Sequence, residues 1–544
     1  MAVKLDLADI QGNILTAYGK LGFPKGRFIL LHVDDAARGR RFATAMLPMI
    51  TTALRWPSLR SKIPTGHIVA PRPLVAVNIA FSWSGLEALG VPSATLRGMP
   101  DEFIQGMMAR ASILGDDFEG RDPGKSWDDV WTGAWGADSN AVHILVTLNA
   151  QMNADGSPTT ALDERTAAIE ALCESIGGVR VLPGHNPPGN APARFQDLSA
   201  ITVTQGGAVT ALPIEHFGFV DAIGDPAFAG QYPDGFERTV VKGAGAVDGQ
   251  RVWRPLATGE FLLGFPDEAQ EVAGAAFPLS FSRNGTFMAY RKLHQNVAAF
   301  RAFIRETSGR FGAVFGIENP EEASATLMAK IGGRWSDGTP LARAPSYAAW
   351  RQFQTQYPVV SMEADHARYI ARSQALADFS YGDDPTGVKC PLGSHLRRAN
   401  TRDGMAPTGR EGSALNNRRR IIRRGLPYGQ SPDGVEDSDE HGVVMLIVCA
   451  SLFRQFEFVQ QQWIHYGLDA RSGNDCCPLV GNHSSGAHGA AKAKFVIPSD
   501  PKSGRPPFVA EGIPQFVEAR GGEYFFVPSM TALRMIGAGS VDPT

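Results

Sequence analysis

The same order of strand-like and helix-like segments occurs twice along the chain, and this repetition limits the folds that the chain can adopt. In the first half, strand-like runs at residues 28–33, 74–82 and 143–148 alternate with helical patterns at 36–50, 101–111 and 162–176. In the second half, strands are expected at 286–290 and 443–450, and helices at 292–306 and 453–463. Two such sets predict an α+β protein built from two similar domains.

The length and the glycine and proline content suggest where the two domains meet. A chain of 544 residues is too long for one compact core. Stretches rich in Pro and Gly occur at 183–192 and at 230–249. We place the boundary at the second stretch, which gives an N-terminal domain of residues 1–235 and a C-terminal domain of residues 236–544.

Charge and hydropathy narrow the functional classes. The net charge is -3, whereas a dedicated nucleic-acid binder is usually basic overall, so no nucleic-acid partner is expected. The longest apolar runs, such as 443–450, are too short to cross a bilayer, so no membrane association is expected. No signal peptide is visible, which predicts a cytoplasmic protein; a secreted protein stays open if a presequence was removed. Monomer and homo-oligomer both stay open.

One histidine lies among many arginines. His395 belongs to the stretch CPLGSHLRRANTR at 390–402, and nine arginines fall from His395 to Arg424. Imidazole is a good iron ligand, and arginine is the usual partner of carboxylates. This combination is typical of a haem site, which needs an axial nitrogen and cations for its propionates. No CxxCH occurs among the five cysteines, which excludes covalent c-type haem attachment.

Other interpretations of His395 remain open from the sequence alone. A lone histidine is more often a hydrogen-bonded structural residue than a ligand. His366, on an expected helix, is a rival axial ligand, and His216 and His294 are weaker candidates.

Two further stretches carry groups suited to proton transfer and charge stabilisation. Asp221 lies in HFGFVDAIGDP, where apolar neighbours would raise its pKa and suit it to acid–base work; a plain turn that caps backbone amides is the alternative. The stretch RRRIIRR at 418–424 contains an Ile-Ile pair, which indicates a buried strand or turn that carries Arg423 inward. The alternative is a solvated basic face or a polyanion-binding patch.

Taken together with several shorter stretches, these motifs make the chain resemble the dye-decolourising peroxidase family. The resemblance covers almost the whole chain. It is carried by DIQGNIL at 9–15, WSGLEALG at 83–90, GMMARA at 106–111, GEFLLGF at 259–265, NGTF at 284–287, QFEFVQ at 455–460 and GGEYFFVPS at 521–529.

The resemblance implies a fold, a cofactor and a reaction. It implies two ferredoxin-like halves, each with an antiparallel four-stranded sheet, and haem b in the C-terminal half. It further implies a peroxidase that reduces hydrogen peroxide and oxidises bulky aromatic or phenolic compounds or dyes. An alternative is a haem-binding or haem-handling protein with little peroxidase activity.

The resemblance also assigns roles to residues of this chain. His395 would be the axial iron ligand, Asp221 the distal acid–base and Arg423 the distal charge stabiliser. The positions implied to contact the cofactor are Arg402, as a propionate partner, with Ala222, Ile223, Gly224, Val443 and Met445. Asp475 would hydrogen-bond the second nitrogen of His395.

Three residues depart from the family pattern. Ala222 replaces a glycine, which removes easy access to positive φ in the turn that carries Asp221. Thr401 replaces a proline before the propionate arginine, and Met445 replaces a common aromatic with an oxidisable thioether.

Overall fold

The structure is a computed structural model, and it describes residues 3–57, 68–116, 126–132, 140–187, 189–221, 223–233, 240–273, 275–361, 364–406, 408–483 and 493–541. Ala222 therefore lies outside the described residues.

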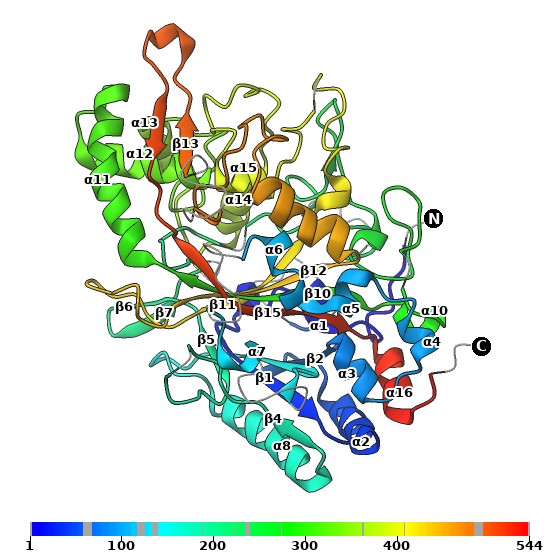
Figure 1. Cartoon of the computed structure of the whole chain (residues 1–544). Coiled ribbons are helices and arrows are strands. Elements are labelled where there is room, and N and C mark those ends of the chain that lie inside the picture. Colours follow the sequence, from blue (N-terminus) through cyan, green and yellow to red (C-terminus); the bar gives the residue numbers. More distant parts are fainter. Residues whose placement is uncertain are drawn as a thin grey trace.

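One antiparallel sheet runs through the middle of the molecule (Figure 1). Its order is β11-β12-β10-β15-β2-β3-β1-β4, and β5 pairs with β1 as the ninth strand. The strands are β1 (Lys25–Val33), β2 (Val75–Phe81), β3 (Ile144–Ala150), β4 (Val179–Val181), β5 (Gln196–Ser199), β10 (Thr286–Gln295), β11 (Ile422–Tyr428), β12 (Gly442–Cys449) and β15 (Val517–Val527). The α+β class with antiparallel pairing is thus confirmed.

The two expected four-stranded sheets exist, but they are joined. The N-terminal set β2-β3-β1-β4 and the C-terminal set β11-β12-β10-β15 meet where Phe526 of β15 pairs with Phe81 of β2. The same large apolar cluster contains Phe42 and Phe81 from the first half and Phe287 and Phe526 from the second. The halves therefore share a core, which buries apolar surface that neither could cover alone.

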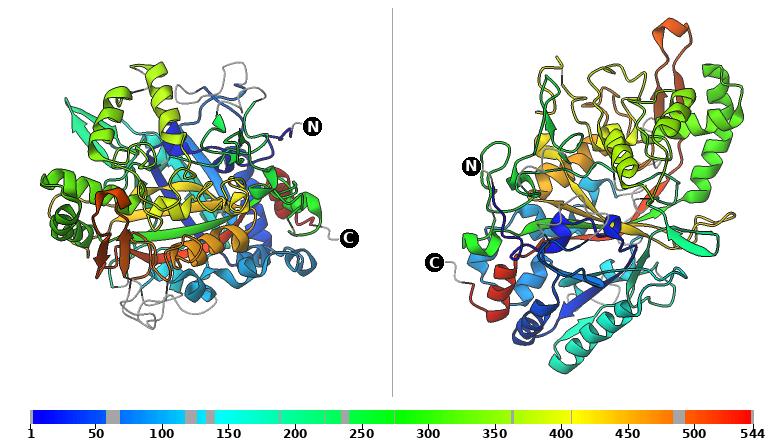
Figure 2. Two further views of the ribbon diagram at one scale, coloured as in Figure 1. Left: turned by 90° about the horizontal axis from the view of Figure 1, so that it is seen from above. Right: turned by 180° about the vertical axis from the view of Figure 1, so that it is seen from behind.

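Helices lie on both sides of the sheet. In Figure 1 α11 to α15 lie on the upper side of the sheet and α2, α3, α8 and α16 on the lower side, and the view from behind in Figure 2 shows the same separation. The upper helices are α11 (Val297–Phe315), α12 (Pro320–Gly332), α13 (Tyr347–Gln356), α14 (His366–Ala377) and α15 (His395–Ala399). The lower ones include α2 (Ala36–Met46), α3 (Trp83–Ala88), α8 (Thr160–Ile176) and α16 (Met530–Ala538).

The remaining elements extend these layers. They include α5 (Asp101–Ala109), α6 (Ala111–Leu114), the π-helical segments η8 (Leu452–Glu457) and η9 (Val459–Ile464), and the hairpins β6 (Thr202–Gln205) with β7 (Ala208–Ala211), β8 (Ala246–Val247) with β9 (Trp253–Arg254), and β13 (Lys494–Ile497) with β14 (Phe508–Glu511). The short helices α1 (Gly12–Leu15), α4 (Ser93–Leu96), α7 (Asp129–Thr132) and α10 (Leu279–Ser282) are also present. Within the described ranges, every helix is too short or too polar to cross a bilayer.

The expected helix at 292–306 is wrong at its start. Lys292 and Leu293 belong to β10, where they pair with β12 on one side and with β15 on the other. Helix α11 begins only at Val297 and continues to Phe315. Two-sided strand pairing satisfies the backbone of residues 292–294 and overrides their helical apolar spacing.

Two other helices also differ from expectation in detail. The helix expected at 36–50 ends at Met46 and continues as the 3-10 turn η2 (Leu47–Met49), because Pro48 cannot donate to the helical ladder. The helix expected at 453–463 is present as the π-helical segments η8 and η9.

Candidate active site

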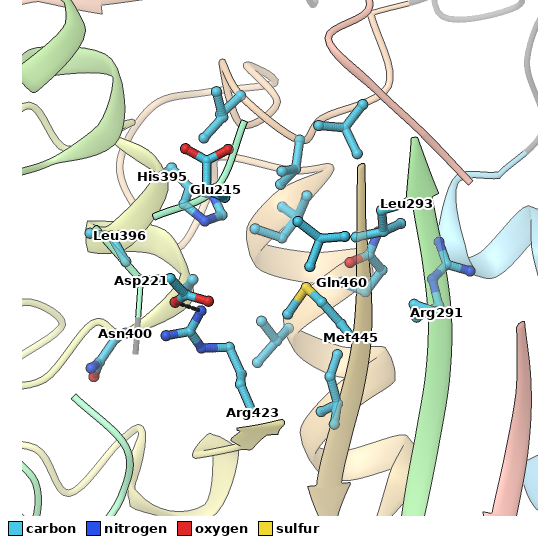
Figure 3. Close-up of a pocket in the computed structure, with 18 of the residues that line it drawn as sticks. Glu215, Asp221, Arg291, Leu293, His395, Leu396, Asn400, Arg423, Met445 and Gln460 are labelled. Atoms are coloured by element: carbon cyan, nitrogen blue, oxygen red, sulfur yellow. Dashed lines mark hydrogen bonds and ion pairs between the residues drawn. The ribbon is translucent and has the colours of Figure 1, made fainter. Parts of the chain in front are cut away.

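A cavity of about 240 Å³ lies between the C-terminal half of the sheet and the segments above it. Its apolar floor comes from alternate residues of β10, β12 and β15: Leu293, Val443, Met445, Ile447, Val517 and Ala519. The opposite wall includes His395, Leu396 and Ala399 of α15, while the loop at 215–225 closes one side. Figure 3 shows Met445 and Leu293 projecting toward the space in front of His395.

His395 lies at the first position of the short helix α15 and lines the cavity. The preceding residue fixes this helix, because Ser394 Oγ donates to the carbonyl of Lys330 at 2.5 Å. Burial lowers the pKa of His395 to about 4, and the positive charge of Arg423 acts in the same direction. The imidazole is therefore neutral at neutral pH, which is the state that can donate a lone pair to a metal.

Asp221 and Arg423 form an ion pair in the same cavity. Arg423 Nη1 lies 2.8 Å from Asp221 Oδ1 (Figure 3). The side chain of Arg423 is 31% exposed and that of Asp221 is 49% exposed, and both line the cavity. The carboxylate raises the pKa of Arg423 more than burial lowers it, so this arginine is a fixed cation. The expectation that the Ile-Ile pair carries Arg423 inward is confirmed. Ile422, the first residue of β11, is fully buried, and the next residue, Arg423, lines the cavity.

Three deeply buried arginines lie beside the cavity without an ion-pair partner among the described residues. Arg334 and Arg420 line the cavity, and among the described residues their side chains donate only to backbone carbonyls. Arg402 does not line it; its Nη1 donates to Ala377 and Phe379 carbonyls, and its Nε and Nη2 have no hydrogen-bond partner in the described part. Burial lowers the pKa of Arg402 to about 9 and those of Arg334 and Arg420 to about 10. Such a cluster suits an anionic ligand.

The structure adds Glu215, which the sequence did not single out. Its two oxygens accept the backbone N–H groups of Phe217 and Phe219, both at 2.9 Å, and Gln295 donates to it as well. Burial raises the pKa of Glu215 to about 7. One of its partners, Gln295, lies 80 residues away in sequence, so no local sequence signal marks Glu215.

A second unpredicted group is the pair Arg291–Asp116, which lines the opposite end of the cavity. The guanidinium of Arg291 donates to both Asp116 oxygens, at 2.5 and 2.6 Å, and both side chains are 4% exposed. This bidentate pair joins β10 to the segment after α5, which ties the N-terminal half of the chain to the cavity wall.

Comparison with known proteins gives a consistent result over the whole chain. The family profile described as the DyP dimeric alpha+beta barrel domain matches residues 9–181. The chain is 30% identical to the multifunctional dye peroxidase DyP2 of Amycolatopsis sp. over 97% of this chain and 96% of that protein. This chain belongs to the dye-decolourising peroxidase family.

Further similarities agree with this membership. Peroxidase 2 of Mycetinis scorodonius is 28% identical, covering 98% of this chain and 88% of the relative. A solved dye-decolorizing peroxidase in complex with 2,6-dimethoxyphenol has a TM-score of 0.69 and 24% identity, covering 98% of this chain and all of that chain, which supports the fold. The protein is thus a peroxidase, and peroxidases of this family depend on haem.

The structure places most of the residues that the peroxidase resemblance assigned to the cofactor on one cavity. Ile223, Gly224, Val443 and Met445 line it together with the three principal residues. Gly224 has a φ of 88°, a conformation that suits glycine, and a Cβ there would lie 3.4 Å from Asn400 Nδ2.

Asp475 and the rival histidines lie elsewhere. Asp475 Oδ1 lies 3.4 Å from Lys494 Nζ, while His395 Nδ1 lies 3.3 Å from Cys477 Sγ, so the assignment of Asp475 stays a prediction. His366 is exposed on α14. His216 is held by Ser431 and the carbonyl of Tyr428, and His294 by the carbonyl of Asp437.

Proposed function

We propose that this peroxidase binds haem b in the cavity, reduces hydrogen peroxide and oxidises aromatic or phenolic compounds, including dyes. The observation that carries the proposal is the meeting of His395 with the ion pair Asp221–Arg423 in one cavity. The phenolic class is supported by the 2,6-dimethoxyphenol complex of the similar dye-decolorizing peroxidase.

The residues present fit haem b in charge and in shape. Haem carries two propionates on a flat apolar ring, so it needs cations at one edge and apolar side chains on its faces. The buried arginines without ion pairs, including the unpartnered Nε and Nη2 of Arg402, supply the cations. The apolar floor formed by β12 and its neighbours supplies the faces.

His395 is the proposed iron ligand, and it would hold the iron through Nε2. Its other nitrogen, Nδ1, already has a protein contact, whereas no partner of Nε2 is recorded among the described residues. When bound, haem would supply an iron centre that takes two electrons from the reductant and delivers them to peroxide.

Asp221 is the proposed acid–base. A carboxylate at the cavity wall can accept a proton from the oxygen of hydrogen peroxide that faces it, and can return this proton to the departing oxygen. Arg423 is the proposed charge stabiliser, because its guanidinium is fixed beside Asp221 and can donate to the oxygen on which negative charge develops. Arg402 is the proposed propionate partner.

The test is haem binding and peroxide consumption by purified protein. Titration with hemin should produce a saturable absorption band, and the loaded protein should consume hydrogen peroxide while oxidising 2,6-dimethoxyphenol or an anthraquinone dye. His395→Ala should lose the absorption signature of a histidine ligand and most of the turnover. A His395→Ala variant with the wild-type spectrum would contradict the ligand assignment, and normal haem uptake without peroxide consumption would favour a haem-handling protein.

A further inference from the structure

The proposed iron ligand contacts a thiol. Cys477 Sγ lies 3.3 Å from His395 Nδ1, and Cys477 is fully buried. This is the hydrogen bond that the structure records for Nδ1 among the described residues. The sequence had suggested a carboxylate, Asp475, at this place.

The thiol is held in position by its backbone. The N–H of Cys477 donates to the carbonyl of Ile464 at 2.7 Å, which ties it to the end of η9. Its carbonyl accepts the N–H of Gly481 at 2.9 Å, and a Cβ at Gly481 would come within 2.5 Å of that carbonyl oxygen. The turn that presents Cys477 to His395 is thus closed on both sides and needs a glycine at position 481.

The carboxylate that the family resemblance suggested is engaged with a cation. Asp475 precedes Cys477 by two residues, and its Oδ1 lies 3.4 Å from Nζ of Lys494 on β13. Burial raises the pKa of Asp475, and Lys494 acts against this rise.

Sulfur and carboxylate differ in what they do to an imidazole. An imidazole that binds iron through Nε2 keeps its proton on Nδ1 and donates this hydrogen bond to its partner. A carboxylate accepts strongly and pulls the ring toward imidazolate, which makes the ring a better electron donor. A thiol sulfur is a weak acceptor, so it orients the ring with much less transfer of charge.

We propose that Cys477 is the positioning residue for His395, and that its thiol keeps the axial imidazole a weaker electron donor than a carboxylate partner would. The inference rests on the proposed haem ligation by His395. Its consequence is a ferric/ferrous reduction potential of the bound haem that is more positive than in the same protein with a carboxylate at position 477.

The test compares four variants of the full-length, haem-loaded protein by spectroelectrochemical titration and by the iron–histidine stretching band. Cys477→Asp should shift the potential to more negative values and raise the stretching frequency. The buried Arg398, whose Nη2 has no partner in the described part, acts electrostatically on both His395 and Cys477 and would help to accommodate the new carboxylate. Cys477→Ser, which is nearly isosteric, should shift the potential and the stretching frequency in the same directions as Cys477→Asp, but by smaller amounts. If Cys477→Asp does not fold, Cys477→Ser alone tests the inference.

Cys476→Ser and Asp475→Asn are the matched controls. Cys476 Sγ contacts His483 Nδ1 at 3.3 Å instead of His395, so its variant should keep the wild-type potential, as should Asp475→Asn. Unchanged potentials in haem-loaded Cys477→Ser and Cys477→Asp would overturn the inference while leaving the proposed function intact. A shift in Asp475→Asn with none at Cys477 would overturn it in favour of Asp475. A wild-type protein that takes up no hemin would overturn the proposed function and this inference together.

Discussion

At the scale of single residues, three charge states meet in and beside the cavity. His395 is neutral, Asp221 is paired with a fixed cation, and Arg334 and Arg402 have no anionic partner among the described residues. Burying an unpaired cation is costly, so the protein pays stability for it unless an anion binds there. The combination of these groups points to a binding site for an anionic ligand more specifically than any one residue does, because buried cations without an anionic partner destabilise a purely structural core.

Asp221→Asn should lower kcat/KM for hydrogen peroxide by about 10²–10⁴-fold, because an amide cannot carry the proton. Haem affinity should stay close to that of the wild type, since Asp221 holds neither the iron nor the propionates in our proposal. Stopped-flow mixing of the loaded enzyme with peroxide measures the first quantity, and hemin titration the second. A wild-type rate in the Asn variant would refute the role given to Asp221.

Arg402→Ala should affect haem affinity and leave the peroxide rate nearly unchanged, which is the reverse of the effect expected for Asp221→Asn. Loss of a propionate partner should weaken haem affinity, by roughly 10-fold for an outer contact of this type. The peroxide rate of the fraction that remains loaded should change little, because Arg402 lies outside the cavity wall that carries Asp221. The same two measurements check this outcome, and a variant with unchanged affinity would argue against propionate binding.

Glu215 predicts a dependence of stability on pH. Its pKa is raised from 4.5 to about 7 by burial, so between these values the folded protein binds a proton that the unfolded chain has lost. The contribution of Glu215 to the free energy of unfolding is fully present below about pH 4.5 and is lost as the pH rises through 7. This loss amounts to at most about 3 kcal/mol. Urea unfolding should therefore show Glu215→Gln gaining stability relative to the wild type from pH 5 to pH 8; a constant difference would exclude this account.

At the scale of elements, strand β12 divides the molecule into a cavity side and a core side. Val443, Met445 and Ile447 line the cavity, whereas Val444 is fully buried in the apolar cluster below the sheet. The period of two along a strand places these neighbours on opposite faces.

A pair of adjacent substitutions on β12 tests this division. Val444→Ala should reduce the free energy of unfolding of the haem-free protein by about 2 kcal/mol, because it leaves a void in a packed core. Val443→Ala should cost less than about 1 kcal/mol, since its side chain borders open space, and should mainly change haem affinity. Equal losses of stability in urea titrations would contradict the assignment of the two faces.

The elements also show what the sequence could and could not predict. Alternation and apolar runs placed β1, β2, β3, β12 and α8 correctly, because their patterns are local. The start of α11 was missed because pairing of Lys292 and Leu293 with two strands from distant parts of the chain decided it. Glu215 and Cys477 were missed for the same reason: Cys477 reaches His395 across 82 residues of sequence.

At the scale of the whole molecule, the two halves depend on one another. Strand β15 joins the C-terminal set to β2, and the largest apolar cluster draws residues from both halves. The boundary between an N-terminal domain of residues 1–235 and a C-terminal domain of residues 236–544 stays a prediction from the sequence.

The shared core predicts cooperative unfolding. Scanning calorimetry of the haem-free protein should show one transition, because separating the halves would expose the cluster that contains Phe81 and Phe526. A fragment of residues 236–544 should be poorly soluble by itself for the same reason. Two well-separated transitions would instead indicate halves that fold independently.

Strand β15 lies between β10 and β2 in space but near the end of the chain in sequence, at Val517–Val527. During synthesis, every other strand of the sheet leaves the ribosome before the one that joins its halves and supplies Val517 and Ala519 to the cavity. The nascent chain therefore has no complete cavity until β15 has been synthesised, and we expect cofactor binding to follow the pairing of this last strand with β10 and β2.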